Sequence, residues 1–257
     1  MHPYYTATIR ERRQIEGLVW LSLAALELAR TAQPGQYALA RPSRSLDPLL
    51  WPVIFLAGAD PAKGLVELLI DPRQPATAWL VNLPVGITLD LCAPLGTPFV
   101  PAPATQTLLL AGAGAALPAL LFAARRHASR LSIALLLAGD EQYLPPPFFL
   151  PETVEVQTSS AGDTALFDLL AAHTPSSPIR WADQILFALP PNLLGDAAAA
   201  MRTARLRWER GLAQVVVAGP MPCGLGVCRA CQIETRNGWQ RRCIEGPVLD
   251  LRDIRLR

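Results

Sequence analysis

Four of the five cysteines of the chain lie in one stretch near its C-terminus, between Cys223 and Cys243. Their spacing is C-x4-C-x2-C, and the fourth cysteine follows after eleven further residues. This spacing is typical of plant-type [2Fe–2S] ligation, in which four thiolates hold two irons. We therefore predict that Cys223, Cys228, Cys231 and Cys243 ligate a [2Fe–2S] cluster.

The residues between these cysteines favour a tight loop followed by a hairpin. Gly224 and Gly226 allow the backbone to curl at positive φ, so that three thiolates can converge on one small cluster. The Asn-Gly pair at 237–238 is a strong hairpin signal. A hairpin at that point would bring Cys243 back beside Cys231.

Two other kinds of site compete with this interpretation. Zinc also binds C-x2-C, but neither a second such pair nor a histidine pair follows here. Disulfides suit small secreted chains, and we find no secretory signal. The fifth cysteine, Cys92, lies in an apolar run and is interpreted as an inert buried thiol.

Length and composition indicate a folded protein with more than one domain. The chain has 257 residues, of which 51% are hydrophobic and 17% are charged, so a large core can form. The net charge of +2 does not indicate a nucleic-acid partner. The uncharged segment 107–124 is long enough to cross a membrane, but its glycines and proline favour a strand, a turn and a helix. We expect no membrane span and, since no targeting peptide is recognised, a cytoplasmic location.

The first part of the chain reads as a series of short strands separated by turns. Such a series is typical of an antiparallel β-barrel, which we expect over residues 1–103. The run Leu18–Leu28 could also form a helix on composition. The expected strands are Tyr5–Ile9, Leu18–Leu23, Gln36–Ala40, Trp51–Leu56, Leu65–Ile70 and Thr88–Leu91.

After a proline cluster, strands and helices alternate. This alternation predicts a Rossmann-like parallel α/β domain over residues 104–218, followed by a small [2Fe–2S] lobe over 219–257. Helices are expected over Ala115–His127, Thr164–Ala172 and Asp196–Arg210. Strands are expected over Thr107–Ala111, Leu131–Ala138, Val154–Gln157, Gln184–Ala188 and Ala213–Val217. The fold class is therefore multidomain, β plus α/β.

The sequence resembles the electron-transfer subunits of NAD-linked dihydroorotate dehydrogenase, a branch of the ferredoxin reductase-like family. The resemblance covers nearly the whole chain. It is most specific at the loop that begins Cys-Gly-Leu-Gly-Val-Cys at residue 223, and at the closing segment 243–248. The segments Pro-Gly-Gln-Tyr at 34–37 and Pro-Leu-Gly at 94–96 also match the family.

The resemblance implies an FAD site and an NAD site, although several of their motifs are degenerate. An alanine, Ala76, stands in the place of a family glycine, and an aromatic and a basic residue that the family has around Leu69-Ile70-Asp71 are replaced. The family's Cys-Gly-Pro segment is Leu-Pro-Pro at 189–191. The implied flavin-binding residues are Arg41, Pro42, Ser43, Leu69, Ile70, Ala76 and Thr77, and the implied NAD-binding residues are Gly112 and Gly114.

These cofactors fit together chemically, because a nicotinamide exchanges a hydride and a cluster exchanges single electrons, so that a flavin is needed between them. The resemblance implies an electron-transfer subunit that binds a catalytic flavoprotein subunit in a hetero-oligomer and links dihydroorotate oxidation, in pyrimidine synthesis, to NAD. Arg229 could raise the cluster potential. The alternative is a scaffold or relay subunit without flavin or NAD chemistry, in a redox complex of the sulfur-reductase or hydrogenase type.

Overall fold

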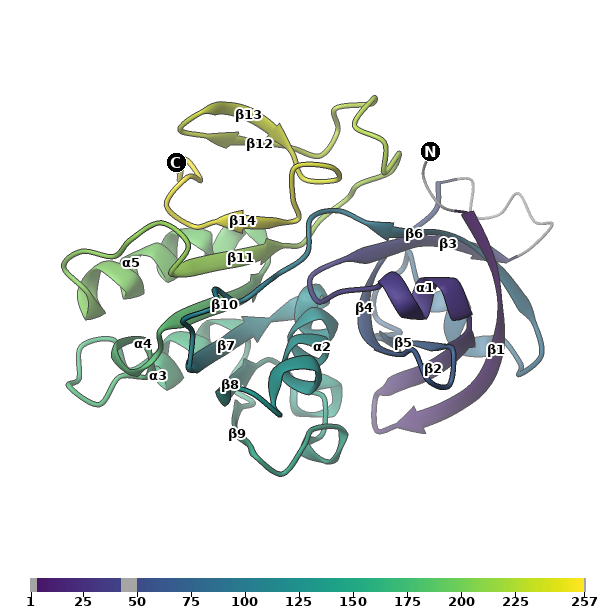
Figure 1. The fold of residues 1–257 in the computed structure, drawn as a ribbon, viewed down its shortest axis with the longest axis horizontal. Helices are drawn as coiled ribbons and strands as arrows, with labels where there is room; N and C mark the ends of the chain where they lie inside the picture. The colour runs from purple at the N-terminus through teal and green to yellow at the C-terminus, as the bar shows by residue number, and fades with distance from the viewer. Residues whose placement is uncertain (1–3, 43–49, 257) are drawn as a thin grey trace.

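The computed structural model describes residues 4–42 and 50–256. Its first part is a closed antiparallel barrel in which the described strands follow the order β1-β2-β5-β4-β3-β6 (Figure 1). This confirms the expected barrel. The strands are β1 (Tyr4–Ile15), β2 (Leu18–Ala24), β3 (Tyr37–Pro42), β4 (Val53–Asp60), β5 (Leu65–Ile70) and β6 (Thr88–Leu95).

Alternation of buried and exposed side chains closes the barrel around an apolar interior. In β6 every second residue is buried, and its inward side chains join those of the other strands in one core. The run Leu18–Leu28 divides, with β2 followed directly by the short helix α1 (Leu26–Thr31). We had not predicted this helix separately. Leu28 and Ala29 of α1 are buried in the barrel core, so tertiary packing supports the helix.

The second part of the chain is a mostly parallel sheet in the strand order β14-β11-β10-β7-β8-β9. The strands in the middle of this sheet contain continuous apolar runs, because both of its faces are covered. This confirms the expected α/β arrangement. The strands are β7 (Thr107–Ala113), β8 (Ser132–Ala138), β9 (Val154–Ser159), β10 (Gln184–Leu189), β11 (Ala213–Val217) and the antiparallel edge strand β14 (Val248–Asp250).

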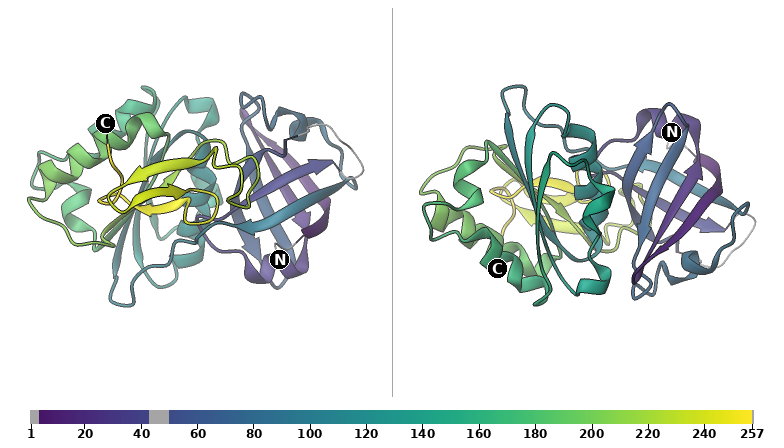
Figure 2. Two further views of the ribbon diagram at one scale, coloured as in Figure 1. Left: turned by 90° about the horizontal axis from the view of Figure 1, so that it is seen from above. Right: turned by 90° about the horizontal axis from the view of Figure 1, so that it is seen from below.

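The two faces of this sheet pack against different elements (Figure 2). One face packs on α2 (Leu117–His127), which also contacts β4 of the barrel, and the other packs on α3 (Leu166–Leu170), α4 (Pro178–Trp181) and α5 (Leu194–Ala204). Short 3₁₀ turns complete the chain at Ala78–Asn82, Gly114–Ala116, Glu141–Tyr143, Pro147–Phe149, Asp163–Ala165 and Pro191–Leu193.

Two of the expected helices have different bounds. The helix expected over Asp196–Arg210 ends at Ala204, because Arg205 is extended and its guanidinium donates to the carbonyls of Ile179 and Ala182. The helix expected over Thr164–Ala172 is a 3₁₀ turn followed by α3, and it ends where Ala171 adopts a positive φ.

Side-chain contacts fix the barrel against the α/β sheet. Arg125 of α2 pairs with Glu67 of β5 and lies over the ring of Trp20. The same Trp20 ring stacks on Phe149, with ring centroids 4.3 Å apart. These contacts join the barrel to α2 and to the 3₁₀ turn Pro147–Phe149 of the α/β part.

The C-terminal segment crosses over both parts. The hairpin β12 (Gln232–Thr235) and β13 (Gly238–Arg241) lies above the α/β sheet, and the loop before it reaches the barrel (Figures 1 and 2). Strand β14 then joins the edge of the sheet. Within residues 4–42 and 50–256, no helix is long and apolar enough to cross a membrane.

Candidate functional site: a cysteine loop and an interdomain cavity

The four clustered cysteines are arranged as two pairs. The sulfurs of Cys223 and Cys228 lie 3.2 Å apart. Cys231 and Cys243 are both buried, and their side chains interact with each other. In the described part of the chain, no three His, Cys, Asp or Glu side chains gather closely enough for a single metal ion. Two separate pairs suit the two irons of a [2Fe–2S] cluster better than the single tetrahedral centre of a zinc site.

Backbone N–H groups point at the first pair. The amide of Leu225 donates to Cys223 Sγ at 3.5 Å. Burial raises the pKa of Cys223, but hydrogen bonds from the backbones of Cys228, Leu225 and Val227 outweigh it, and the pKa falls to about 6. The loop therefore favours a thiolate at Cys223, the form that binds metal.

The second pair has the opposite electrostatic character. Burial, followed by the interaction with Cys231, raises the pKa of the Cys243 thiol to about 12. Two adjacent buried thiolates repel each other, so a cation is needed to hold both in the charged form. This is the chemistry expected of a pair that binds iron.

The two loop glycines are required by geometry. Gly224 and Gly226 have φ of +61° and +75°. A Cβ on Gly224 would lie 2.9 Å from the Cδ1 atoms of both Leu39 and Leu95 in the barrel, and one on Gly226 would lie 2.6 Å from Ile244. The loop therefore curls at these positions and rests directly on strands β3 and β6.

The hairpin and the closing segment bring the fourth cysteine into place. Gln232 pairs with Arg241 across the hairpin, and the amide of Arg242 donates to the Cys231 carbonyl at 3.2 Å. The buried Tyr37 hydroxyl of β3 donates to the Cys243 carbonyl at 3.2 Å. Cys243 thus lies beside Cys231, as the hairpin predicted, and both are attached to the barrel.

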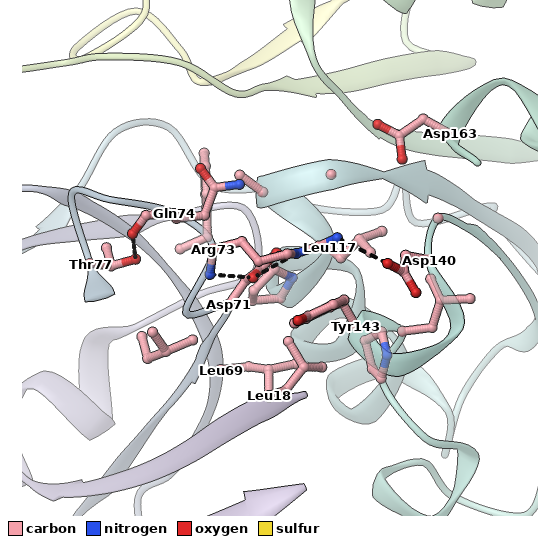
Figure 3. Close-up of a pocket in the computed structure, with 18 of the residues that line it drawn as sticks. Leu18, Leu69, Asp71, Arg73, Gln74, Thr77, Leu117, Asp140, Tyr143 and Asp163 are labelled. Atoms are coloured by element: carbon pink, nitrogen blue, oxygen red, sulfur yellow. Dashed lines mark hydrogen bonds and ion pairs between the residues drawn. The ribbon is translucent and has the colours of Figure 1, made fainter. Parts of the chain in front are cut away.

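A cavity of about 530 Å³ opens between the barrel and the α/β sheet (Figure 3). Five of the residues expected to bind nucleotide cofactors line it, namely Leu69, Ile70, Ala76, Thr77 and Gly114. The first four come from β5 and the segment after it, and Gly114 begins the turn into α2. One cavity therefore contains residues of both the expected flavin site and the expected NAD site.

Gly112 lies behind the cavity rather than on its surface. A Cβ there would lie 2.7 Å from Leu120 and 2.8 Å from the Ala188 carbonyl, so this glycine allows β7, β10 and α2 to pack closely. Its position supports the turn at Gly114, where the start of a helix offers N–H groups to phosphate.

The structure does not bring Arg41 to this cavity. Its guanidinium lies 3.6 Å from Asp90 and 4.6 Å from the centre of the Trp51 ring, on a different part of the barrel. Pro42 ends β3 opposite Leu89. Ser43 lies outside the described residues.

A charged cluster that we had not predicted lies in the cavity. Arg73 is the only basic side chain among its described lining residues, while Asp71, Asp140 and Asp163 are acidic. The Arg73 guanidinium is 2.8 Å from Asp71 and 3.4 Å from Asp140, and it lies 3.4 Å from the centre of the Tyr143 ring. Figure 3 shows these side chains between the two walls. The sequence offered one signal for this cluster. Arg73 is a basic residue two positions after Asp71, in a segment where a basic residue of the family is replaced.

The barrel followed by an α/β sheet is the fold of ferredoxin reductase-like structures, and the cysteine loop lies in the segment after it. Residues 220–255 match the family described as the iron-sulfur cluster binding domain of dihydroorotate dehydrogenase B. Among solved structures, an NADH-dependent reduced ferredoxin-NADP oxidoreductase aligns with a TM-score of 0.75 and 19% identity, over 97% of this chain and 89% of the other. A ferredoxin NADP⁺ reductase from Neisseria gonorrhoeae, with bound FAD and NADP, aligns with a TM-score of 0.63 and 12% identity, over 83% and 98%.

The proteins that match in sequence point to a narrower family than the solved structures do. The chain is 27% identical to the electron transfer subunit of dihydroorotate dehydrogenase B (NAD(+)) from Shouchella clausii, over 87% of this chain and 86% of the relative. It is 25% identical to the subunit of the same name from Geobacillus kaustophilus, over 94% of each. The resemblance to this family is therefore confirmed along most of the chain.

Proposed function

We propose that this chain is the electron-transfer subunit of a dihydroorotate dehydrogenase, and that it passes electrons between a catalytic flavoprotein subunit and NAD. The paired cysteines on a loop attached to the barrel carry the proposal. The names of its sequence relatives support the choice of substrate and acceptor. The proposal includes assembly with the catalytic subunit and a cytoplasmic location, where pyrimidine synthesis would take place.

The described residues suit the implied cofactors. Cys223 with Cys228, and Cys231 with Cys243, would each hold one iron of the [2Fe–2S] cluster. The apolar wall at Leu69 and Ile70 would contact FAD, beside Thr77, whose hydroxyl donates to the Gln74 carbonyl at 3.4 Å. A bound flavin would supply the exchange between electron pairs and single electrons.

The remaining assignments extend this proposal. Gly114 would begin the turn that faces NAD phosphates, before α2, and Gly112 would support that turn from behind. We keep the division into residues 1–103, 104–218 and 219–257 as the proposed limits of the barrel, the α/β domain and the cluster lobe. Because Cys228 is exposed, a cluster held by it would lie near the surface, where a partner subunit could approach.

Two observations favour a second candidate, a relay subunit that has a cluster but no flavin. The arginine expected to hold a flavin phosphate pairs with Asp90 instead, and the described residues that line the cavity include three aspartates and one arginine. Acidic side chains repel a pyrophosphate. Under this candidate, the purified chain would contain iron and no FAD.

Reconstitution with the catalytic subunit tests the proposal. The full chain is mixed anaerobically with the catalytic flavoprotein subunit of a dihydroorotate dehydrogenase, dihydroorotate and NAD, and NADH formation is followed. We expect the chain to accelerate NADH formation, and Cys228→Ser, which changes an exposed ligand, to abolish the acceleration without unfolding the chain. Equal rates with the wild-type chain and with Cys228→Ser would contradict the proposal.

A further inference from the structure

Arg242 is a buried cation next to the second cysteine pair. The residue is only 7% exposed. Its guanidinium donates to the carbonyls of Ala218 at 2.5 Å, Cys231 at 3.2 Å and Pro220 at 3.4 Å. All these acceptors are neutral. Among the ion pairs of residues 4–42 and 50–256, none includes Arg242.

The surrounding backbone is shaped to keep this guanidinium in place. Gly219 has no side chain where a Cβ would collide with Nη1 of Arg242, and it adopts a φ of +137°. A Cβ on Gly246 would lie 3.0 Å from the Arg242 carbonyl, so this glycine lets the closing segment pack against the backbone of Arg242. The side chain thus occupies a fitted site between the end of β11 and the cysteine loop.

A buried charge without an anionic partner is unfavourable, so a counter-charge is expected nearby. The Nε atom of Arg242 donates to the carbonyl of Cys231, and Cys243 is the next residue along the chain, so the guanidinium lies against the backbone of the second cysteine pair. Carbonyl dipoles satisfy the guanidinium N–H groups but do not neutralise its charge. The contact with the Cys231 carbonyl thus puts the cation beside a pair of buried thiols that become negative when they bind metal.

We propose that Arg242 is the counter-charge of the iron–sulfur cluster and raises its reduction potential. The inference rests on the [2Fe–2S] assignment of the proposed function. A cluster of two ferric irons, two sulfides and four thiolates has a charge of about −2, and one added electron makes it about −3. A fixed cation stabilises the more negative, reduced form more strongly, and burial keeps salt from screening it.

The neighbouring arginines provide the comparison. Arg229 lies within the cysteine loop but is exposed, so water and salt screen its charge. Arg241 is already paired with Glu245. We therefore assign to Arg242 the effect on the cluster's reduction potential that the sequence suggested for Arg229.

A redox titration of the purified full chain, followed by its visible spectrum, tests the inference. We expect Arg242→Gln to make the cluster about tenfold harder to reduce, which lowers its potential by about 59 mV for one electron. Arg242→Lys keeps the charge and should stay near the wild-type potential. The matched control Arg229→Gln should give a smaller shift that disappears at high salt. An unchanged potential in Arg242→Gln, or equal shifts in Arg242→Gln and Arg229→Gln, would overturn the inference.

Metal content separates this inference from the proposed function. A wild-type chain without iron would overturn both the proposed function and this inference. An iron-loaded chain whose potential does not change in Arg242→Gln would overturn only the inference. If Arg242→Gln purifies without iron, it has no cluster potential to measure, and Arg242→Lys then separates a role of the charge from a role of the guanidinium contacts. Full iron content at the wild-type potential in Arg242→Lys would then support a role for the charge, and loss of iron there too would show that the guanidinium contacts matter only for structure.

Discussion

Replacing Gly224 with alanine tests whether the cysteine loop rests on the barrel as described. Two costs are expected. An L-residue at the positive φ of +61° costs about 1–2 kcal/mol. The added methyl group would lie 2.9 Å from Leu39 and Leu95, and such overpacking typically costs about 1–3 kcal/mol. The total is about 2–5 kcal/mol.

Gly211→Ala is the matched control for this substitution. Gly211 has a φ of +86°, but nothing lies within 4 Å of the added methyl, so only the backbone cost of about 1–2 kcal/mol applies. Thermal unfolding of the iron-loaded chains is compared by circular dichroism. For a chain of this size, 1 kcal/mol lowers Tm by about 2–4 °C.

The difference between the two variants isolates the contact with the barrel. We expect Gly224→Ala to unfold about 2–12 °C below Gly211→Ala, because overpacking adds about 1–3 kcal/mol. Combining Gly224→Ala with Leu39→Ala should cost less than the sum of the single changes, since the smaller side chain makes room for the methyl. Equal Tm values for the two glycine variants, with additive effects in the double variant, would refute the contact.

Three further predictions concern the cavity, the cluster support and the helix α2. Arg73→Ala should weaken FAD binding at least tenfold in a fluorescence titration, since a charged hydrogen bond contributes about 1.5–3 kcal/mol, whereas Asp71→Asn should strengthen it; changes in the same direction would count against this charge assignment. Tyr37→Phe removes the hydrogen bond to Cys243 and should cost about 1 kcal/mol while iron content stays unchanged; an unaltered Tm would show that the bond contributes nothing. Burial and two neighbouring arginines lower the pKa of His127 from 6.5 to about 4, so the unfolded chain binds the proton first and stability is lost as pH falls from 6.5 towards 4; urea titrations should find a smaller loss in His127→Gln.

The cysteine loop could be predicted because the features that shape it come from residues close together in the sequence. The spacing, Gly224, Gly226 and the Asn-Gly turn together specify a curl and a return strand, and the structure places Cys243 beside Cys231 accordingly. A series of short strands separated by turns predicted the barrel, and the alternation of strands with helices predicted the α/β sheet.

Features that depend on distant contacts were not predictable. Arg41 matches a family motif, but Asp90 on a neighbouring strand holds it away from the cavity. Arg73 becomes important only because Asp140 and Tyr143 face it from the α/β sheet. The burial of Arg242 depends on carbonyls at the end of β11, which no local pattern connects with the cysteine loop.

The most direct test of the central claim is a count of iron, zinc and flavin in the anaerobically purified chain, together with its visible spectrum. We expect about two irons per chain, a [2Fe–2S] spectrum and about one FAD per chain released on heating. Iron without flavin would favour the relay candidate. Zinc in place of iron would contradict the claim that this chain transfers electrons.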